Sequence, residues 1–271
     1  MKIKCALGLI SLVWLAIGCT AVQTTNSGAI GINRKQYMAV SEQTVEQGAI
    51  EAYNQELDKA RKNNALNTHA PALERVRKIS QRLIPQTTVF RPDASQWQWE
   101  VNVETSKEVN AYCMPGGKIM VYTGLIEKLK ATDAELAAVI GHEMAHALRE
   151  HSRERMSRQY GQQIALAVAA IATGAGEGMM NLAGMVSDVT FTLPHSREQE
   201  SEADLIGLEL IARAGYDPHA SVSLWQKMMR EADNAPPQFM STHPSSATRI
   251  KDLQTSLPKV LPLYQSAKRA E

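Results

Sequence analysis

The chain has 271 residues, enough for one sizeable domain or two small ones. Its 44% hydrophobic and 21% charged residues are typical of globular proteins and exclude a disordered or fibrous chain. The formal net charge of +1 gives no sign of the basic surface that binds nucleic acids, so we expect no nucleic-acid partner.

The N-terminus has the pattern of a bacterial signal peptide that ends at a lipidation site. Lysines lie near its start, and the apolar stretch Leu7–Ile17 is too short for a permanent membrane span. The small residue Gly18 directly before Cys19 resembles the bacterial lipobox. We therefore expect residues 1–18 to be removed and Cys19 to be acylated. The alternative is an ordinary cleaved signal with an incidental cysteine.

Acyl chains on Cys19 would anchor the protein, because each buried methylene adds about 0.8 kcal/mol of membrane affinity. Thr20 follows, and the absence of Asp at that position favours the outer membrane under the sorting rule of Gram-negative lipoproteins. The pattern thus predicts a protein on the periplasmic side of the membrane. Cys113 would be the cysteine left in the mature chain, and its apolar neighbours indicate a buried structural thiol.

The folded part begins after a polar stretch. Residues 19–40 are rich in Thr, Ser, Asn and Gly and are expected to form a tether, followed by a domain over residues 41–271. A polar helix is expected over Ser41–Lys62. A second helix is expected over Ala72–Leu83, and it ends before Pro85.

Three strands are predicted next. Apolar and polar residues alternate over Trp97–Val103, which indicates a half-buried strand with both tryptophans facing a core; a ligand platform is the alternative. Strands over Val109–Cys113 and Lys118–Tyr122 are joined by the turn Pro115–Gly117.

The rest of the chain is predicted to be helical. Thr132 and Glu135 form a capping box that begins a helix through His151. The apolar, Gly-interrupted segment Ile164–Val186 is either a core helix with a loop or a flap that leans on the membrane. Further helices are expected over Arg197–Ala214, Pro218–Ala232 and Ala247–Leu257. The fold class is therefore mainly α with a small β-sheet.

A metal-binding motif lies on the helix that follows the capping box. His142 and His146 are four residues apart, so both imidazoles lie on one helix face and can reach one ion. Glu143 lies beside them, where its carboxylate can take a proton from a water on that ion. Zinc is the ion that this arrangement favours.

A catalytic zinc needs a third protein ligand. One class of zinc peptidases takes a third His six residues after the second, following a Gly, but here these positions are Ser152 and Arg149, so that class is excluded. His151 points away from His142 on a helical wheel, and we expect it to be a surface residue.

A later helix offers carboxylates instead. Within Arg197–Ala214, Glu200 and Asp204 share a face with small and apolar residues. Buried carboxylates are costly unless they are paired or bind metal, so we expect Glu200 to be the ligand and Asp204 to accept a hydrogen bond from a ligand histidine. Three others point the opposite way and are expected to be solvated: Glu198, Glu202 and Glu209.

Several motifs together resemble the gluzincin metallopeptidases related to the CAAX prenyl protease and HtpX, and above all their periplasmic lipoprotein members of the BepA and LoiP type. The resemblance implies a zincin-like α+β domain with Glu200 as third ligand and a site role for His243, either in catalysis or as a cap on the resting metal. It also implies a substrate held as an added strand near Asn110, Gly116 and Gly117. The matching pieces run from Asn110-Ala111 through Pro115-Gly116-Gly117, His142–His146, Ser196–Gly207 and Thr242-His243-Pro244.

The sequence thus predicts a zinc-dependent endopeptidase with one zinc ion per chain. Its expected substrates are misfolded or misassembled polypeptides of the cell envelope, an expectation that rests on family analogy alone. The rival hypothesis is a zinc-bearing chaperone that seldom cleaves and serves the outer-membrane assembly machinery. A purely structural zinc site is disfavoured, because such sites usually have four protein ligands and favour Cys.

Overall fold

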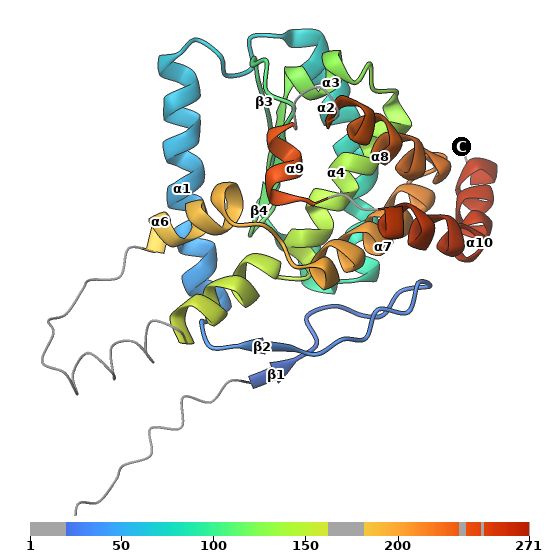
Figure 1. Cartoon of the computed structure of the whole chain (residues 1–271), viewed down its shortest axis with the longest axis horizontal. Coiled ribbons are helices and arrows are strands. Elements are labelled where there is room, and N and C mark those ends of the chain that lie inside the picture. Colours follow the sequence, from blue (N-terminus) through green and yellow to red (C-terminus); the bar gives the residue numbers. More distant parts are fainter. Residues whose placement is uncertain (1–19, 162–181, 233–236, 245–246, 271) are drawn as a thin grey trace, which may run out of the picture.

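The computed structural model describes residues 20–161, 182–232, 237–244 and 247–270 (Figure 1). The predicted signal peptide and the lipidation site at Cys19 lie outside the described residues, as do residues 164–181 of the apolar segment.

Helices dominate the fold, which confirms the predicted class of a mainly α domain with a small sheet. Among the described residues, no helix combines the length and apolarity needed to cross a membrane. The α-helices are α1 (Glu42–Lys62), α2 (Ala70–Leu83), α3 (Thr123–Lys128), α4 (Asp133–Leu148), α6 (Leu182–Ser187), α7 (Arg197–Arg213), α8 (His219–Ala232), α9 (Gln238–Thr242) and α10 (Ala247–Ala270). Shorter turns are the 3₁₀ helices η1 (Ile84–Val89) and η2 (Pro92–Gln96) and the π-helix η3 (Asp188–Thr192).

A three-stranded sheet has the order β3-β5-β4, with β5 (Lys118–Tyr122) in the centre. β4 (Ala111–Met114) runs antiparallel to β5, and Gly116 and Gly117 turn the chain between them with φ of 78° and 81°. Glycine adopts such angles without strain, so the predicted hairpin is confirmed. β3 (Glu100–Glu104) runs parallel to β5.

The first predicted strand is shorter than expected. β3 begins at Glu100, and Trp97 and Trp99 precede it, half-buried against the core with ring centroids 5.4 Å apart. Both tryptophans therefore have a packing role.

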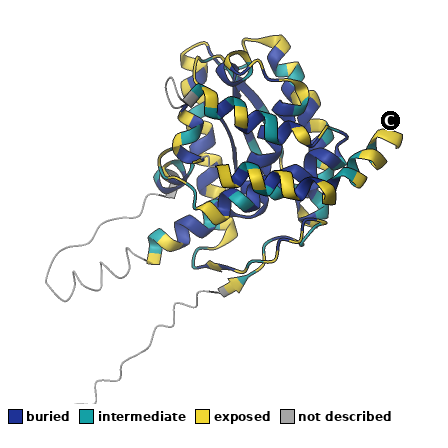
Figure 2. Cartoon of the chain, turned by 45° about the vertical axis from the view of Figure 1, so that its right-hand side comes forward, coloured by how far each residue is buried: buried dark blue, intermediate teal, exposed yellow. Residues whose placement is uncertain are grey.

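Helices cover the sheet on both faces. On one face α1 packs against Tyr112 and Met120, and the hydroxyl of Tyr53 donates to the carbonyl of Ile119 over 3.0 Å. On the other face the core is shared with α2 and α4, whose inner residues are almost wholly buried (Figure 2). Cys113 is buried on this face, and burial raises the pKa of its thiol well above the ordinary value, as a structural cysteine requires.

Helix α4 begins as predicted and ends earlier. Thr132 and Glu135 form the reciprocal capping box. The helix stops at Leu148 because Glu150 takes a left-handed conformation with φ of 52°, and a new helical stretch occupies residues 151–161. The predicted continuous helix through His151 was therefore wrong, and the break turns His151 back toward the protein interior.

Helices α4 and α7 pack against each other at a pair of glycines. A Cβ atom on Gly207 would lie 2.9 Å from the backbone nitrogen of His142, and one on Gly141 would lie 3.3 Å from the carbonyl of Gly207. Only glycines allow this approach. The contact brings the first histidine of the motif directly against the helix that carries Glu200.

The segment expected to be a tether packs against the domain instead. β1 (Thr20–Val22) and β2 (Gln36–Met38) form an antiparallel pair that runs beneath the helices (Figure 1). Between them, Ile30 and Ile32 are 5% and 8% exposed and join the core. The polar composition suggested a tether, but these apolar side chains pack against the domain and polar contacts of Arg34 and Gln36 join the segment to it. We call residues 20–38 the N-terminal arm.

Candidate metal centre

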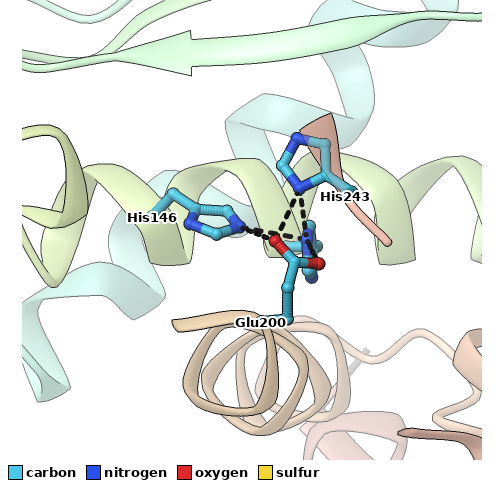
Figure 3. Close-up of side chains that lie close together, drawn as sticks. His146, Glu200 and His243 are labelled. Atoms are coloured by element: carbon cyan, nitrogen blue, oxygen red, sulfur yellow. Dashed lines mark hydrogen bonds and ion pairs between the residues drawn. The ribbon is translucent and has the colours of Figure 1, made fainter. Parts of the chain in front are cut away.

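Helix α4 places the three motif residues on the side that faces α7. His142, Glu143 and His146 are 4%, 4% and 5% exposed, so all three are buried. Glu200 of α7 is 1% exposed and points at them. Figure 3 shows His146, Glu200 and His243 converging from three separate elements. The structure therefore brings together the residues that the sequence predicted to hold a metal.

The converging atoms have the spacing of ligands around one ion. The Nε2 atoms of His142 and His146 are 3.1 Å apart, and they lie 3.6 and 3.4 Å from the carboxylate oxygens of Glu200. Two nitrogen ligands of a tetrahedral zinc, each about 2.05 Å from the ion, would be about 3.3 Å apart. The Nδ1 atom of His243 joins the group, 3.3 Å from His142 Nε2 and 3.0 Å from Glu200.

The position of the ring proton on His142 means that two hydrogen-bond acceptors point at each other in this site. Asp204 Oδ1 lies 3.1 Å from His142 Nδ1, and since an ionised carboxylate only accepts, the ring carries its proton on Nδ1. His142 Nε2 therefore presents a lone pair to the Glu200 carboxylate. Arg249 pairs with one oxygen of that carboxylate, and a metal ion among the ring nitrogens would satisfy the lone pairs that remain. The residues thus fit a divalent metal.

Asp204 is held beside His142 by donors from other residues. It is 5% exposed, and it accepts hydrogen bonds from Arg249 over 2.6 and 2.7 Å and from the indole of Trp225 over 3.2 Å. Burial alone would raise the pKa of Asp204, but the guanidinium of Arg249 outweighs it and lowers the pKa. A carboxylate that stays ionised is the partner that fixes the orientation of His142.

Glu143 lies beside the ligand group and takes no part in it. Its Oε1 atom is buried without a hydrogen-bond partner and lies 3.6 Å from His243 Nε2. Burial raises the pKa of Glu143, and the charges of His243 and His142 offset that rise only in part. A carboxylate with a raised pKa and a free oxygen is suited to accept a proton.

His243 is clamped between two rings. Its imidazole stacks on Phe239 at a centroid distance of 4.3 Å and on His195 at 4.8 Å. Burial alone would lower the pKa of His243, but the carboxylates of Glu143 and Glu200 outweigh it and raise the pKa. The side chain is 3% exposed, so in this arrangement it closes the metal centre from one side.

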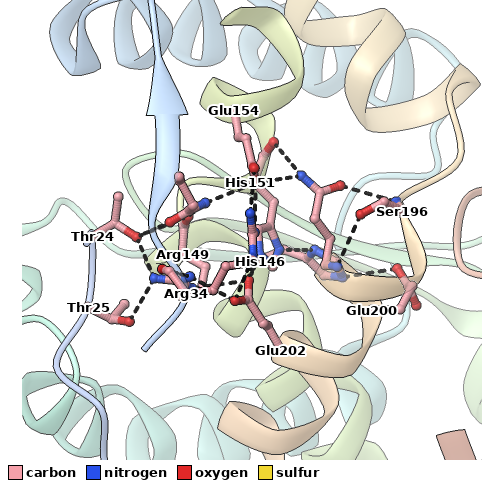
Figure 4. A network of polar contacts seen from close by, with 12 residues as sticks. Thr24, Thr25, Arg34, His146, Arg149, His151, Glu154, Ser196, Glu200 and Glu202 are labelled. Atoms are coloured by element: carbon pink, nitrogen blue, oxygen red, sulfur yellow. Dashed lines mark hydrogen bonds and ion pairs between the residues drawn. The ribbon is translucent and has the colours of Figure 1, made fainter. Parts of the chain in front are cut away.

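Two predictions about nearby residues were wrong. His151, expected at the surface, is fully buried, with its Nδ1 atom 2.8 Å from His146 Nδ1. Glu202, expected to be solvated, is 6% exposed and pairs with Arg34 and Arg149 (Figure 4). The N-terminal arm covers this face of α7.

The two other glutamates of α7 that were expected to be solvated differ in exposure. Glu209 is 0% exposed and accepts from the backbone nitrogen of Ile30 in the arm, so its expected exposure was wrong as well. Glu198, in the first turn of α7, is exposed as predicted.

His195 was given no role from the sequence, yet it belongs to the site. Its ring lies 4.0 Å from the ring of His146, and Arg155 Nη1 is 2.8 Å from each of its two nitrogens. Its backbone nitrogen donates to Thr242 over 2.9 Å, which joins the segment before α7 to the loop that carries His243. No spacing rule links His195 to the motif, so the sequence offered no signal for it.

The predicted substrate contacts lie around the hairpin. A Cβ on Gly117 would meet Trp99 at 2.7 Å, and one on Gly116 would meet Glu46 at 3.1 Å. Both glycines are therefore explained by the turn and its packing. The carbonyl of Asn110 accepts from Tyr122 at the start of the hairpin. β5 lies in the centre of the sheet, and β4 forms the edge beside it.

Several peptidases have sequences similar to that of this chain. The profile of peptidase family M48 matches residues 73–257, which include the metal-ligand candidates, Glu143 and His243. The chain is 32% identical to the mitochondrial metalloendopeptidase OMA1 of Schizosaccharomyces pombe over 84% of its own length and 65% of that protein. It is 27% identical to the metalloprotease LoiP of Escherichia coli over 94% of its length and 96% of that protein.

A third relative is the β-barrel assembly-enhancing protease of Escherichia coli, 27% identical over 58% of this chain and 34% of that protein. The chain spans 30–65% of the length of the OMA1 proteins from Arabidopsis thaliana and two yeasts. The sequence predicted a likeness to bacterial lipoprotein peptidases, and mitochondrial metalloendopeptidases match the chain as well. Since the family profile covers more than half of its residues, the chain belongs to peptidase family M48.

Proposed function

We propose that this protein is a zinc-dependent endopeptidase with one zinc ion per chain, held by His142, His146 and Glu200. The observation that carries the proposal is the convergence of two histidine nitrogens and a carboxylate beside the unpartnered oxygen of Glu143. The membership of family M48 and the names of the matching proteases support it.

When bound, zinc would supply a Lewis acid that polarises the scissile carbonyl and lowers the pKa of an attacking water. The protein's own residues do the rest. Glu143 takes a proton from the water as the water oxygen bonds to the carbonyl carbon. Glu143 then gives that proton to the amine nitrogen as the C–N bond breaks. The rise in its pKa through burial favours the acceptance of this proton.

An extended peptide fits along the outer edge of β4. This strand pairs with β5 alone among the described residues, so its other edge can accept an added strand. The ligand residues are buried, however, and His195 and His243 close over them. We infer that a peptide enters after the segments carrying these two rings separate, which requires breaking the hydrogen bond between His195 and Thr242.

Zinc analysis and casein digestion of the wild type and of Glu143→Gln test the proposal. Both proteins should hold about one zinc per chain, and only the wild type should cleave, because the variant keeps the ligands and loses the proton acceptor. Glu198→Gln is the matched control, since Glu198 is exposed and outside the site. A wild type that holds zinc but leaves casein intact would favour the rival function of a zinc-bearing chaperone.

We further propose that the protein is anchored through acylated Cys19 on the periplasmic side of the outer membrane and cleaves misfolded envelope proteins. The sequence pattern around Cys19 and the likeness to the β-barrel assembly-enhancing protease support this location. Labelled palmitate should enter the wild type and not Cys19→Ala, which should become soluble or stay unprocessed. Equal labelling of the two proteins would contradict the anchor.

A further inference from the structure

A second group of buried histidines adjoins the metal centre. His146, His151 and His195 offer ring nitrogens within 4.8 Å of one another, and His151 is 0% exposed. Such a group is either a second metal site or a chain of hydrogen bonds. The two possibilities differ in spacing and in what surrounds the rings.

The spacing favours hydrogen bonds over a second metal. The Nδ1 atoms of His146 and His151 are 2.8 Å apart, a hydrogen-bond distance, whereas two nitrogen ligands of zinc would be about 3.3 Å apart. The third ring has a cation beside it already, because Arg155 Nη1 lies 2.8 Å from both nitrogens of His195. The group is therefore held together by hydrogen bonds.

The direction of these bonds follows from their far end, Glu202. Its two oxygens receive Arg34 and Arg149, and Oε2 also lies 3.0 Å from His151 Nε2 (Figure 4). An ionised carboxylate only accepts, so His151 carries a proton on Nε2.

The other ring nitrogen settles the state of His146. If His151 also carried a proton on Nδ1, it would donate to His146 Nδ1, and the proton of His146 would then lie on Nε2, the atom that faces Glu200. That arrangement is incompatible with a metal ligand. With zinc bound, His151 Nδ1 must accept from His146 Nδ1, which leaves the lone pair of His146 Nε2 directed at the ligand group.

We propose that His151 and Glu202 are positioning residues that hold His146 in its metal-binding tautomer and orientation. The proposal rests on the zinc site proposed above. The two ligand histidines are thus oriented differently. Nδ1 of His142 faces the Asp204 carboxylate directly, whereas Nδ1 of His146 is linked to a carboxylate through a second imidazole.

The N-terminal arm takes part in this arrangement. The guanidinium of Arg34 binds Glu202 through two hydrogen bonds of 2.9 Å and also binds Glu154 over 2.7 and 3.0 Å. Arg149, at the end of α4, binds Glu202 from the same helix that carries His146. The orientation of a metal ligand therefore depends on residues that come before the region matched by the family profile, which begins at residue 73.

Two substitutions at His151 separate positioning from packing. In His151→Asn, the side-chain oxygen takes the place of Nδ1 and still accepts from His146. In His151→Leu, a side chain of similar size offers no acceptor. Both variants lose the bond to Glu202, so the melting temperatures of their metal-free forms should fall to a similar extent. Competition with a zinc chelator should show binding weakened about 10–100-fold in the Leu variant and much less in the Asn variant.

Glu202→Gln should give an intermediate loss of zinc affinity, because its amide can turn either an oxygen or an NH₂ group toward His151. Glu198→Gln is the exposed control on the same helix and should bind zinc as the wild type does. Equal zinc affinity of the Asn and Leu variants at matched melting temperatures would overturn the proposal. If the wild type binds zinc but cleaves nothing, the peptidase function fails while the positioning role stands. If the wild type cleaves casein and all variants bind zinc as tightly as the wild type, the peptidase function stands and the positioning role fails.

Discussion

Helix α7 carries two buried carboxylates, two residues apart, in opposite surroundings. Glu200 is 1% exposed and Glu202 is 6% exposed, so burial does not distinguish them. Glu200 pairs with Arg249 on one oxygen and lies 3.0–3.6 Å from ring nitrogens of three histidines, next to the unpartnered oxygen of Glu143. Glu202 faces donors on both oxygens, from Arg34, Arg149 and His151.

The contrast shows how a ligand can be told from a structural ion pair when both are buried. A structural carboxylate has donors on each oxygen, because an unsatisfied buried charge is costly. Glu200 also has an ion pair, with Arg249, so what identifies it is the group of histidine ring nitrogens that lie 3.0–3.6 Å from its oxygens. Fractional exposure alone would have selected both carboxylates.

The largest effect expected from this comparison is that of Glu200→Gln. The amide is a poor ligand for a divalent metal, so zinc affinity should fall by more than the roughly 10–100-fold typical of residues behind the ligands, and cleavage should be lost with it. The melting temperature of the metal-free form should also fall, because the substitution removes the buried ion pair between Glu200 and Arg249. Chelator competition and calorimetry would measure both quantities. A variant with wild-type zinc affinity would remove Glu200 from the ligand set.

A smaller effect is expected from substitution of His243, which lies next to the candidate metal ligands. Its Nδ1 atom lies among the ligand atoms, 3.0 Å from Glu200, and so occupies a position that water needs. We expect His243→Ala to keep its zinc and to raise turnover by about tenfold, the effect of a capping interaction near 1.4 kcal/mol. A fall of about 100-fold would instead assign His243 to stabilisation of the oxyanion. Unchanged turnover, zinc content and melting temperature would show that it has no role at the site.

Local signals in the sequence predicted much of this fold. The capping box at Thr132 and the turn at Gly116 are set by neighbouring residues and are found as expected. The end of α10 was missed, since the helix continues past Pro258 and Pro262 to Ala270. Spacing likewise predicted the contacts within the metal centre, because His142 and His146 share one helix.

Long-range packing explains what the sequence could not predict. The helical wheel assumed that one face of α7 meets water, but the N-terminal arm covers that face and buries Glu202 and Glu209. A signal was present, since Ile206 lies four residues after Glu202 on the same side and is fully buried. His151 was misplaced for a different reason: the left-handed turn at Glu150 breaks the helix on which its direction was calculated.

The smallest expected effect is on stability at acidic pH. It tests whether Glu202 and its partners form a structural ion-pair network. Glu154 shares Arg34 with Glu202. Burial alone would raise the pKa of Glu154, but hydrogen bonds from Arg34, Gln199 and Gln36 outweigh it and lower the pKa from 4.5 to about 2. Because the folded pKa lies below the unfolded one, this carboxylate stabilises the protein above about pH 4.5 and loses that contribution as the pH falls toward 2.

We therefore expect the melting temperature of the metal-free wild type to fall as the pH is lowered from 5 to 3. Glu154→Gln should be less stable at pH 7 by about 1–2 kcal/mol, a value reduced for solvent screening, and its melting temperature should depend less on pH. Part of the acid dependence should remain, because hydrogen bonds also hold the pKa of Glu202 well below its ordinary value against the effect of burial. Glu198→Gln should follow the wild type throughout. Parallel melting curves for Glu154→Gln and the wild type across this range would show that the arm is not held by ionised carboxylates, and the view of the Glu202 side as a structural ion-pair network would then fail.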